Sequence, residues 1–181
     1  MVLQLSAIAQ KNSKKDQQFI DWALSNWKSD SWKTKQVLYK DGMEKHQLRW
    51  FEGEIFKEDT LRNRVGRLSS EKLKDFLVLT NQEKSQVKRE LELMNQQLWP
   101  KGLFKNSIML DRDSLGYLSK PLGYLKYGKK YKTGFYTFSK PIFLRNNTIC
   151  ILFLDYWCSG LCGDTDISVY KKENGRWKKW L

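Results

Sequence analysis

Two cysteines stand four residues apart, and this spacing sets the first chemical question. Cys158 and Cys162 enclose Ser159-Gly160-Leu161 and precede Gly163, and two glycines allow a backbone to double back. A turn brings Cα atoms within the roughly 4.4–6.8 Å that a disulfide requires, whereas a straight strand does not. We therefore predict a structural disulfide between Cys158 and Cys162.

The third cysteine is predicted to take no part in this bridge. Cys150 lies eight residues before Cys158, which is about 26 Å along an extended strand, and it is expected to be a buried free thiol. The pair lacks the two-residue spacing of thioredoxin-like redox motifs. Three cysteines with one distant histidine also make a poor zinc set.

Three aspartates flank the cysteine turn, with Asp155 before it and Asp164 and Asp166 after it. Clustered carboxylates hold hard cations, and such a cluster would serve a hydrolase or a nuclease. Asp164 and Asp166 also suit turns, because their side chains accept hydrogen bonds from nearby backbone. The segment lacks the glycine and terminal glutamate of a calcium loop, so we predict no bound metal and no cofactor.

The most polarised part of the chain has no acidic residue from Ser114 to Leu154 but contains seven basic ones. Lysines alternate there with tyrosines, a composition suited to stacking bases or sugar rings and neutralising phosphate. Alternatively, the tyrosines pack at a sheet edge while the lysines protect that edge from pairing with other chains. Under the first interpretation the partner is anionic, namely a glycan, a nucleic acid or an acidic protein. The predicted binding residues are Tyr124, Lys126, Tyr127, Lys129 and Lys130.

Motifs of common enzyme classes are missing from the sequence. It contains no Gly-x-Ser-x-Gly elbow and no Gly-x-x-x-x-Gly-Lys phosphate loop. The single histidine, His46, stands among charged and polar neighbours, which is typical of a surface loop. A non-enzymatic binding module is therefore favoured, and a hydrolase or nuclease that uses the three aspartates is the alternative.

An antiparallel sheet is expected to position the cysteine turn. Its central strand is an apolar run in which both alternating faces are apolar, so both faces should be covered. Asn146-Asn147 and Asn174-Gly175 are typical of tight hairpin turns on either side. We expect a four-stranded meander with strands at Phe138–Arg145, Thr148–Trp157, Asp166–Lys172 and Arg176–Trp180.

Upstream residues with helical spacing predict helices that pack on this sheet. One helix spans Ser13–Lys28, and another opens at the capping box Thr80-Asn81-Gln82-Glu83 and stops before Pro100. Phe153 and Trp177 should be buried against Leu24 and Trp27 of the first helix. Further helices are expected at Thr60–Leu68 and from Ser69 or Ser70 through Leu77, with strands at Gln36–Lys40 and Leu48–Phe56.

The C-terminal segment resembles a known group of proteins. The residues concerned are Phe138-Ser139-Lys140-Pro141-Ile142-Phe143, Tyr156, Cys158, Gly160-Leu161-Cys162-Gly163, Val169-Tyr170-Lys171-Lys172, Asn174-Gly175 and Trp177. In this combination they resemble the C-terminal signature of a group of uncharacterised secreted or envelope-associated bacterial proteins. The resemblance covers roughly the last quarter of the chain. It implies a secreted or periplasmic location and no particular reaction.

Length and charge are consistent with this interpretation. A chain of 181 residues with 40% hydrophobic residues suits one α+β domain, here 10–181, with N-terminal helices packed on a C-terminal antiparallel β-meander. A formal net charge of +13 favours anionic partners. Residues 1–9 are mostly apolar and end in Ala7-Ile8-Ala9, which resembles the end of a secretory signal peptide; a short strand or frayed tail is the alternative. No stretch approaches the roughly 18 apolar residues of a transmembrane helix.

Overall fold

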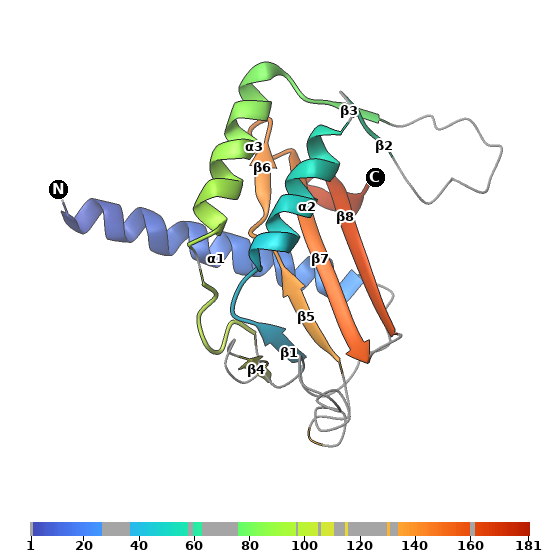
Figure 1. The fold of residues 1–181 in the computed structure, drawn as a ribbon. Coiled ribbons are helices and arrows are strands. Elements are labelled where there is room, and N and C mark those ends of the chain that lie inside the picture. The colour runs from blue at the N-terminus through green and yellow to red at the C-terminus, as the bar shows by residue number, and fades with distance from the viewer. Residues whose placement is uncertain are drawn as a thin grey trace. The chain divides into compact units, whose positions relative to one another are not determined.

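The computed structural model describes residues 2–26, 37–57, 60–62, 76–96, 98–104, 106–110, 115, 130, 134–159 and 162–181. Within these ranges it contains both helices and strands, which confirms the α+β class (Figure 1). The helices are α1 (Val2–Asn26), α2 (Lys45–Phe56) and α3 (Asn81–Met94). The strands are β1 (Val37–Lys40), β2 (Thr60–Arg62), β3 (Phe76–Val78), β4 (Ser107–Leu110), β5 (Phe135–Phe138), β6 (Ile142–Leu144), β7 (Ile149–Ser159), β8 (Cys162–Glu173) and β9 (Arg176–Lys179).

Seven of these strands form one mixed sheet in the order β4-β1-β5-β7-β8-β9, and β6 pairs with β7 beside this path. The pairs β6–β7 and β8–β9 are antiparallel, as expected from their turns. β1 falls within the predicted strand Gln36–Lys40. It pairs in parallel with both β4 and β5, and this parallel pairing was not predicted. The sheet therefore extends beyond the four strands of the expected meander. β2 and β3 form a separate antiparallel pair.

The chain forms two compact units. The first, here called the α1 unit, comprises Met1–Asp41, Trp99–Thr137 and Asp155–Asp164. The second, here called the α2–α3 unit, comprises Gly42–Leu98, Phe138–Leu154 and Thr165–Leu181. The strands β7 and β8 contribute residues to both units.

In the α1 unit, the helix α1 confirms the predicted amphipathic helix but is longer than expected. It begins at Val2, so Ser13 lies inside the helix and is not its N-cap, and residues 2–9 are helical rather than a strand. The predicted apolar stripe is buried, with Ile20 and Leu24 fully inaccessible to solvent. None of the helices in the described ranges is long and apolar enough to cross a membrane.

The strand β1 is anchored by the side chain of Tyr39 in the same unit. Its hydroxyl donates to the carbonyl of Pro100 at 2.6 Å and accepts the N–H of Leu103 at 3.1 Å. Its ring meets Phe104 edge-on at a centroid distance of 5.9 Å. Because Tyr39 is completely buried, satisfying the hydroxyl in this way avoids the cost of an unpaired buried polar group.

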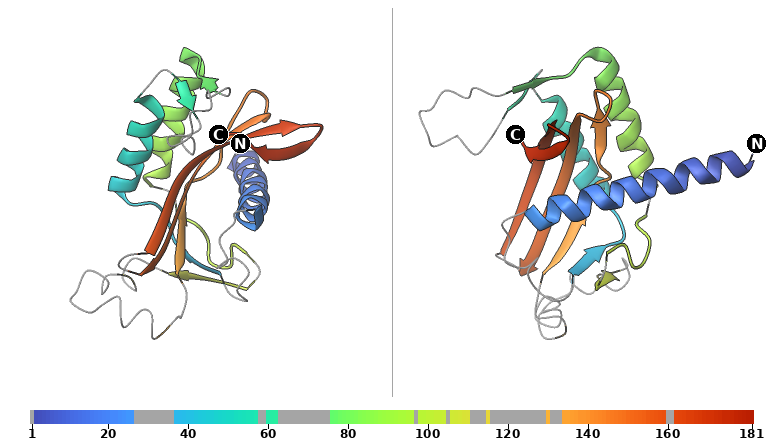
Figure 2. Two further views of the ribbon diagram at one scale, coloured as in Figure 1. Left: turned by 90° about the vertical axis from the view of Figure 1, so that its right-hand side faces the viewer. Right: turned by 180° about the vertical axis from the view of Figure 1, so that it is seen from behind.

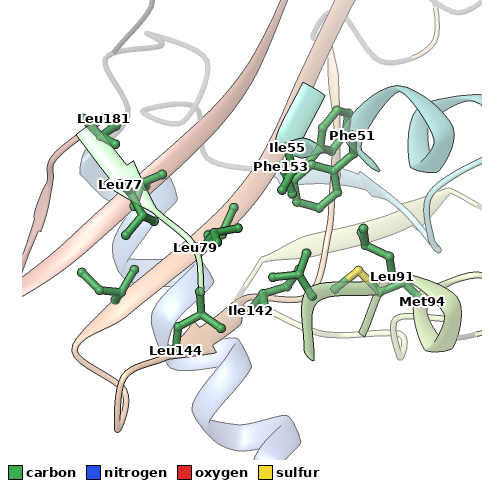
Figure 3. Close-up of a cluster of buried hydrophobic side chains, with 14 of the residues drawn as sticks. Phe51, Ile55, Leu77, Leu79, Leu91, Met94, Ile142, Leu144, Phe153 and Leu181 are labelled. Carbon is green, nitrogen blue, oxygen red and sulfur yellow. The ribbon is translucent and has the colours of Figure 1, made fainter. Parts of the chain in front are cut away.

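In the α2–α3 unit, both helices cover one face of β6 and β7 (Figure 1). The shared core has Phe51 and Ile55 from α2, Leu91 and Met94 from α3, and Phe153 from β7 (Figure 3). The opposite face of β7 is also buried, since Cys150, Leu152 and Leu154 expose at most 3% of their surface. The prediction that both faces of this strand are covered is thus confirmed.

Phe153 is buried as expected, but its helical partner is in α2. Its ring lies 5.6 Å from that of Phe51 and 5.9 Å from that of Trp50. The predicted partner Leu24 belongs to the other unit, and Trp27 lies outside the described residues. Trp177 is only half-buried and packs against Phe143 at 6.0 Å, so its predicted burial in the core was wrong.

The segment Leu48–Phe56, predicted as a strand, is helical. Leu48, Phe51 and Ile55 recur at the spacing of one helix face and are the buried residues of α2. Glu44 and Gln47 form a capping box at its start, with the Glu44 N–H donating to Gln47 Oε1 at 2.9 Å. The cap and the burial of one face together favour a helix over a strand.

The helix α3 begins at the predicted capping box. The Thr80 side chain accepts the Glu83 N–H at 3.2 Å, and the Thr80 N–H donates to Glu83 Oε2 at 2.8 Å. The helix ends at Met94, before the expected limit. Of the two helices predicted upstream, Thr60–Arg62 and Phe76–Val78 are instead the paired strands β2 and β3, because cross-strand pairing outweighs weak local helical preference.

Both predicted hairpin turns are confirmed. Asn146 and Asn147 have φ values of 53° and 63°, and the Thr148 N–H donates to the Arg145 carbonyl at 3.1 Å. Asn174 and Gly175 have φ values of 49° and 78°. Positive φ at both central residues matches the twist of the flanking strands, so each turn fixes the register of its hairpin.

Candidate functional site

The predicted binding residues lie mostly outside the described part of the chain. Tyr124, Lys126, Tyr127 and Lys129 are not described, whereas Lys130 is described and exposed. The tyrosine-rich face therefore stays a prediction.

The three aspartates that the alternative hydrolase or nuclease would use are all described. Asp155 is half-buried on β7, and Asp164 and Asp166 lie on β8 rather than in a turn. No group of three or more histidine, cysteine or acidic side chains suited to a metal occurs among the described residues. Asp166 is engaged within its own unit, since Lys179 Nζ lies 2.5 Å from its Oδ2. The use of the three aspartates by a hydrolase or nuclease stays a prediction.

The structure describes the side chains of two of the three cysteines, Cys150 and Cys158. Cys150 is a buried free thiol, as predicted. Cys158 is half-buried on β7 and Cys162 begins β8. The pairing of Cys158 with Cys162 stays a prediction, because the side chain of Cys162 lies outside the described residues.

His46 is exposed, in agreement with a surface position, but it lies in the first turn of α2 and not in a loop. Its Nδ1 is 3.2 Å from Glu44 Oε2.

A polar cluster on β8 and β9 was not found by sequence reasoning. The Ser168 hydroxyl donates to Asp166 Oδ2, which also accepts from Lys179. Tyr170 is hydrogen-bonded to Ser168, and burial raises the pKa of Tyr170 to about 12. The alternation Asp166, Ser168, Tyr170 along one strand face is the signal that would have revealed the cluster. Ser168 exposes only 3% of its surface, so the hydroxyl at the centre of the cluster is shielded from solvent, while Lys179 and Asp166 remain partly exposed.

Figure 2 shows the hairpin of β8 and β9, coloured red, from two further sides. The sequence of this hairpin also carries dense positive charge. Five of the nine residues from Lys171 to Lys179 are basic and only Glu173 is acidic. The Glu173 carboxylate lies 3.1 Å from Lys178 and 3.6 Å from Lys171. The hydrogen bond from Lys178 lowers the pKa of Glu173. Two lysines cover tryptophan rings, with Lys171 at 5.4 Å from the Trp180 centroid and Lys172 at 5.7 Å from that of Trp177.

The hairpin closes on a β-bulge. The Val169 carbonyl accepts both the Trp180 N–H at 2.8 Å and the Leu181 N–H at 3.0 Å, so two residues oppose one. Val169 and Leu181 are both buried in the core of the α2–α3 unit. The bulge thus fixes the end of β9 to the core and leaves Arg176–Lys179 as a short basic edge.

Comparisons with known proteins add no further assignment. No family model matches the chain, and no curated protein or solved structure shows significant similarity to it.

Proposed function

We propose that the protein is a secreted or envelope-associated, non-enzymatic binding module whose basic, tyrosine-rich face contacts an anionic partner. The observation that carries the proposal is the span from Ser114 to Leu154, which has seven basic residues and no acidic one. Lys130, the described member of this face, is exposed. Tyr124 and Tyr127 supply rings for stacking, and Lys126, Lys129 and Lys130 supply charge. The partner classes are a glycan, a nucleic acid or an acidic protein.

Retention on heparin and on single-stranded DNA tests this proposal. The fraction of wild-type protein that the column retains should fall as salt rises, because binding releases counterions. Replacing Lys126, Lys129 and Lys130 by Gln should flatten the salt dependence. Tyr127→Leu should weaken binding at all salt concentrations, since stacking is not screened.

A matched control removes the same charge elsewhere. Lys45, Lys57 and Lys101 are exposed and lie outside the basic span, so their triple replacement by Gln changes net charge equally. Loss of retention only in the first triple variant supports the proposed face. Equal loss in both variants would reduce the effect to net charge and refute the proposed face.

The secreted or periplasmic location rests on the resemblance of the C-terminal segment and on the proposed Cys158–Cys162 bridge, because disulfides persist in oxidising compartments. Closing so short a loop should stabilise the fold by on the order of 2 kcal/mol. Alkylation under denaturing, non-reducing conditions followed by intact-mass measurement should label Cys150 alone. Three labels would exclude both the bridge and this reason for the location.

We also propose that residues 10–181 fold as one domain. In support, β7 and β8 supply residues to both compact units. Circular dichroism and tryptophan fluorescence should then report one coincident unfolding transition, and two separated transitions would show independent domains.

A further inference from the structure

The strand β9 occupies the outer end of the sheet order. The register pairs Lys172 with Trp177 and Tyr170 with Lys179. The Lys172 N–H donates to Thr148 at 2.7 Å, on the side of β8 away from β9. Both pairs are therefore of the non-hydrogen-bonded type, whose members direct backbone N–H and C=O groups outward. The N–H and C=O of Lys179 thus point to the outer side of β9, where no strand pairs in the part of the chain that the structure describes.

The side chains of this edge select against some partners. Arg176, Lys178 and Lys179 are exposed, and lysines on an edge strand discourage pairing with other edges. Two copies of β9 placed side by side would set like charges opposite one another, which is destabilising. An acidic strand would have the opposite effect, because its carboxylates would meet these cations.

The tryptophans of the hairpin argue against nucleic acid as the partner of this edge. The rings of Trp177 and Trp180 are covered by Lys172 and Lys171, respectively, and Trp177 also contacts Phe143. Base stacking requires accessible ring faces. The edge therefore offers backbone pairing and charge rather than a stacking platform.

We propose that the outer edge of β9 binds an acidic, extended segment of a partner protein by strand addition. Main-chain hydrogen bonds to the N–H and C=O of Lys179 would hold the segment. Carboxylates on alternate residues would face Arg176 and Lys178, which lie on one face of the strand. The bulge at Trp180 and Leu181 ends the edge, so the recognised segment spans the four residues of β9. This surface is separate in sequence from the tyrosine-rich face.

Fluorescence anisotropy with a labelled peptide of alternating Glu and Val tests the proposal, with the Lys/Val peptide as its control. The full chain should bind the acidic peptide and not the basic one. Lys179→Ala removes one charge from the opposite face of the strand, where Lys179 pairs with Asp166, and should weaken binding by at most about twofold. Lys179→Pro removes the same charge and also the outward N–H, and should weaken binding by about a further tenfold. Proline is tolerated on an edge strand when its N–H would face outward, and thermal melting confirms that both variants remain folded.

Equal binding by Lys179→Ala and Lys179→Pro would show attraction by charge alone and overturn strand addition. An acidic peptide N-methylated at alternate residues provides a second measurement on the unaltered protein, and undiminished binding of this peptide would have the same meaning. Failure of the acidic peptide to bind would also overturn the proposal. A further result would also refute the β9 site. If the Lys126, Lys129 and Lys130 variant lost binding while Lys179→Pro kept it, the acidic peptide would bind at the tyrosine-rich face.

Discussion

The two hairpins of the α2–α3 unit share one turn design but differ in almost everything else. The β6–β7 hairpin turns at Asn146-Asn147 and the β8–β9 hairpin at Asn174-Gly175, both with positive φ. In the β6–β7 hairpin, Ile142, Leu144 and residues 149–154 are buried, whereas the residues of β9 are exposed or half-buried. The same local chemistry thus forms a central and an outer hairpin, and the burial of each follows from the elements that pack on it.

The two hairpins also differ in how their polar contacts are arranged. Arg145, beside the first turn, has a φ of 50°, which is costly for a residue with a side chain. Its guanidinium reaches Glu83 Oε1 at 2.8 Å and the Val78 carbonyl at 2.8 Å. These long-range contacts hold the strained residue in place. In the second hairpin the ion pairs join neighbours on the same two strands, so they add little beyond the turn itself.

The largest expected effect is the difference in stability lost when a buried aromatic residue of one hairpin and a half-buried one of the other are truncated. Phe153→Ala should lower the free energy of unfolding by about 3–5 kcal/mol, because it opens a cavity beside Phe51. Trp177→Ala, in the half-buried pair with Phe143, should cost less than half as much. Urea denaturation of both variants measures this ratio. A Phe153→Ala loss below about 1 kcal/mol would mean that β7 is not the central strand.

An intermediate effect concerns the contacts that anchor the first turn. The hydrogen bond from Arg145 lowers the pKa of Glu83, so the ionised form stabilises the fold above the ordinary glutamate pKa. This contribution is lost as pH falls through the lowered pKa. Glu83→Gln should cost about 1–2 kcal/mol at pH 7, and its difference in stability from wild type should shrink as pH falls below the ordinary glutamate pKa.

Arg145→Gln is the matched control for this pH dependence, since it removes the other charge of the pair. Its difference from wild type should shrink over the same acidic range. Chemical denaturation at several pH values provides the measurement, and a constant difference between Glu83→Gln and wild type would contradict the role of the ion pair.

The smallest effect concerns the second turn. Gly175 has a φ of 78° and open space around the position of an added Cβ. Gly175→Ala should therefore cost only the backbone strain, about 1 kcal/mol. Asn147→Gly in the first turn should change stability by less, because glycine adopts positive φ freely. Melting temperatures compare the two, and a larger loss for Asn147→Gly would show that the asparagine side chain holds the first turn.

The sequence correctly predicted those elements that depend on residues close together in the chain. The two turns, the capping box at Thr80 and Glu83, and the apolar strand β7 were all predicted correctly. The segment Leu48–Phe56 was misassigned because its apolar residues fit both a strand and a helix, and packing of Phe51 against Phe153 decides the outcome. The parallel pairing of Val37 with Ser107 joins residues far apart in sequence, and no local pattern encodes it.

The candidate site was less accessible to sequence reasoning. The aspartates near the cysteine turn suggested a cluster, yet Asp166 is paired with Lys179 across β8 and β9. Register decides this pairing, because it places Lys179 opposite Tyr170 and near the polar face of β8. The basic edge at β9 was read only as part of a strand. Its position at the outer end of the sheet makes it a candidate for strand addition, and this position follows from topology and not from composition.

The buried thiol of Cys150 can report how often β7 transiently opens. Its thiol has no solvent-exposed surface, so a disulfide reagent can modify it only when β7 transiently opens. The modification rate in native buffer therefore yields the free energy of that opening. The measurement can be repeated with an acidic peptide present. It would then show whether a peptide bound at β9 slows the opening of β7, which lies two strands inward in the sheet.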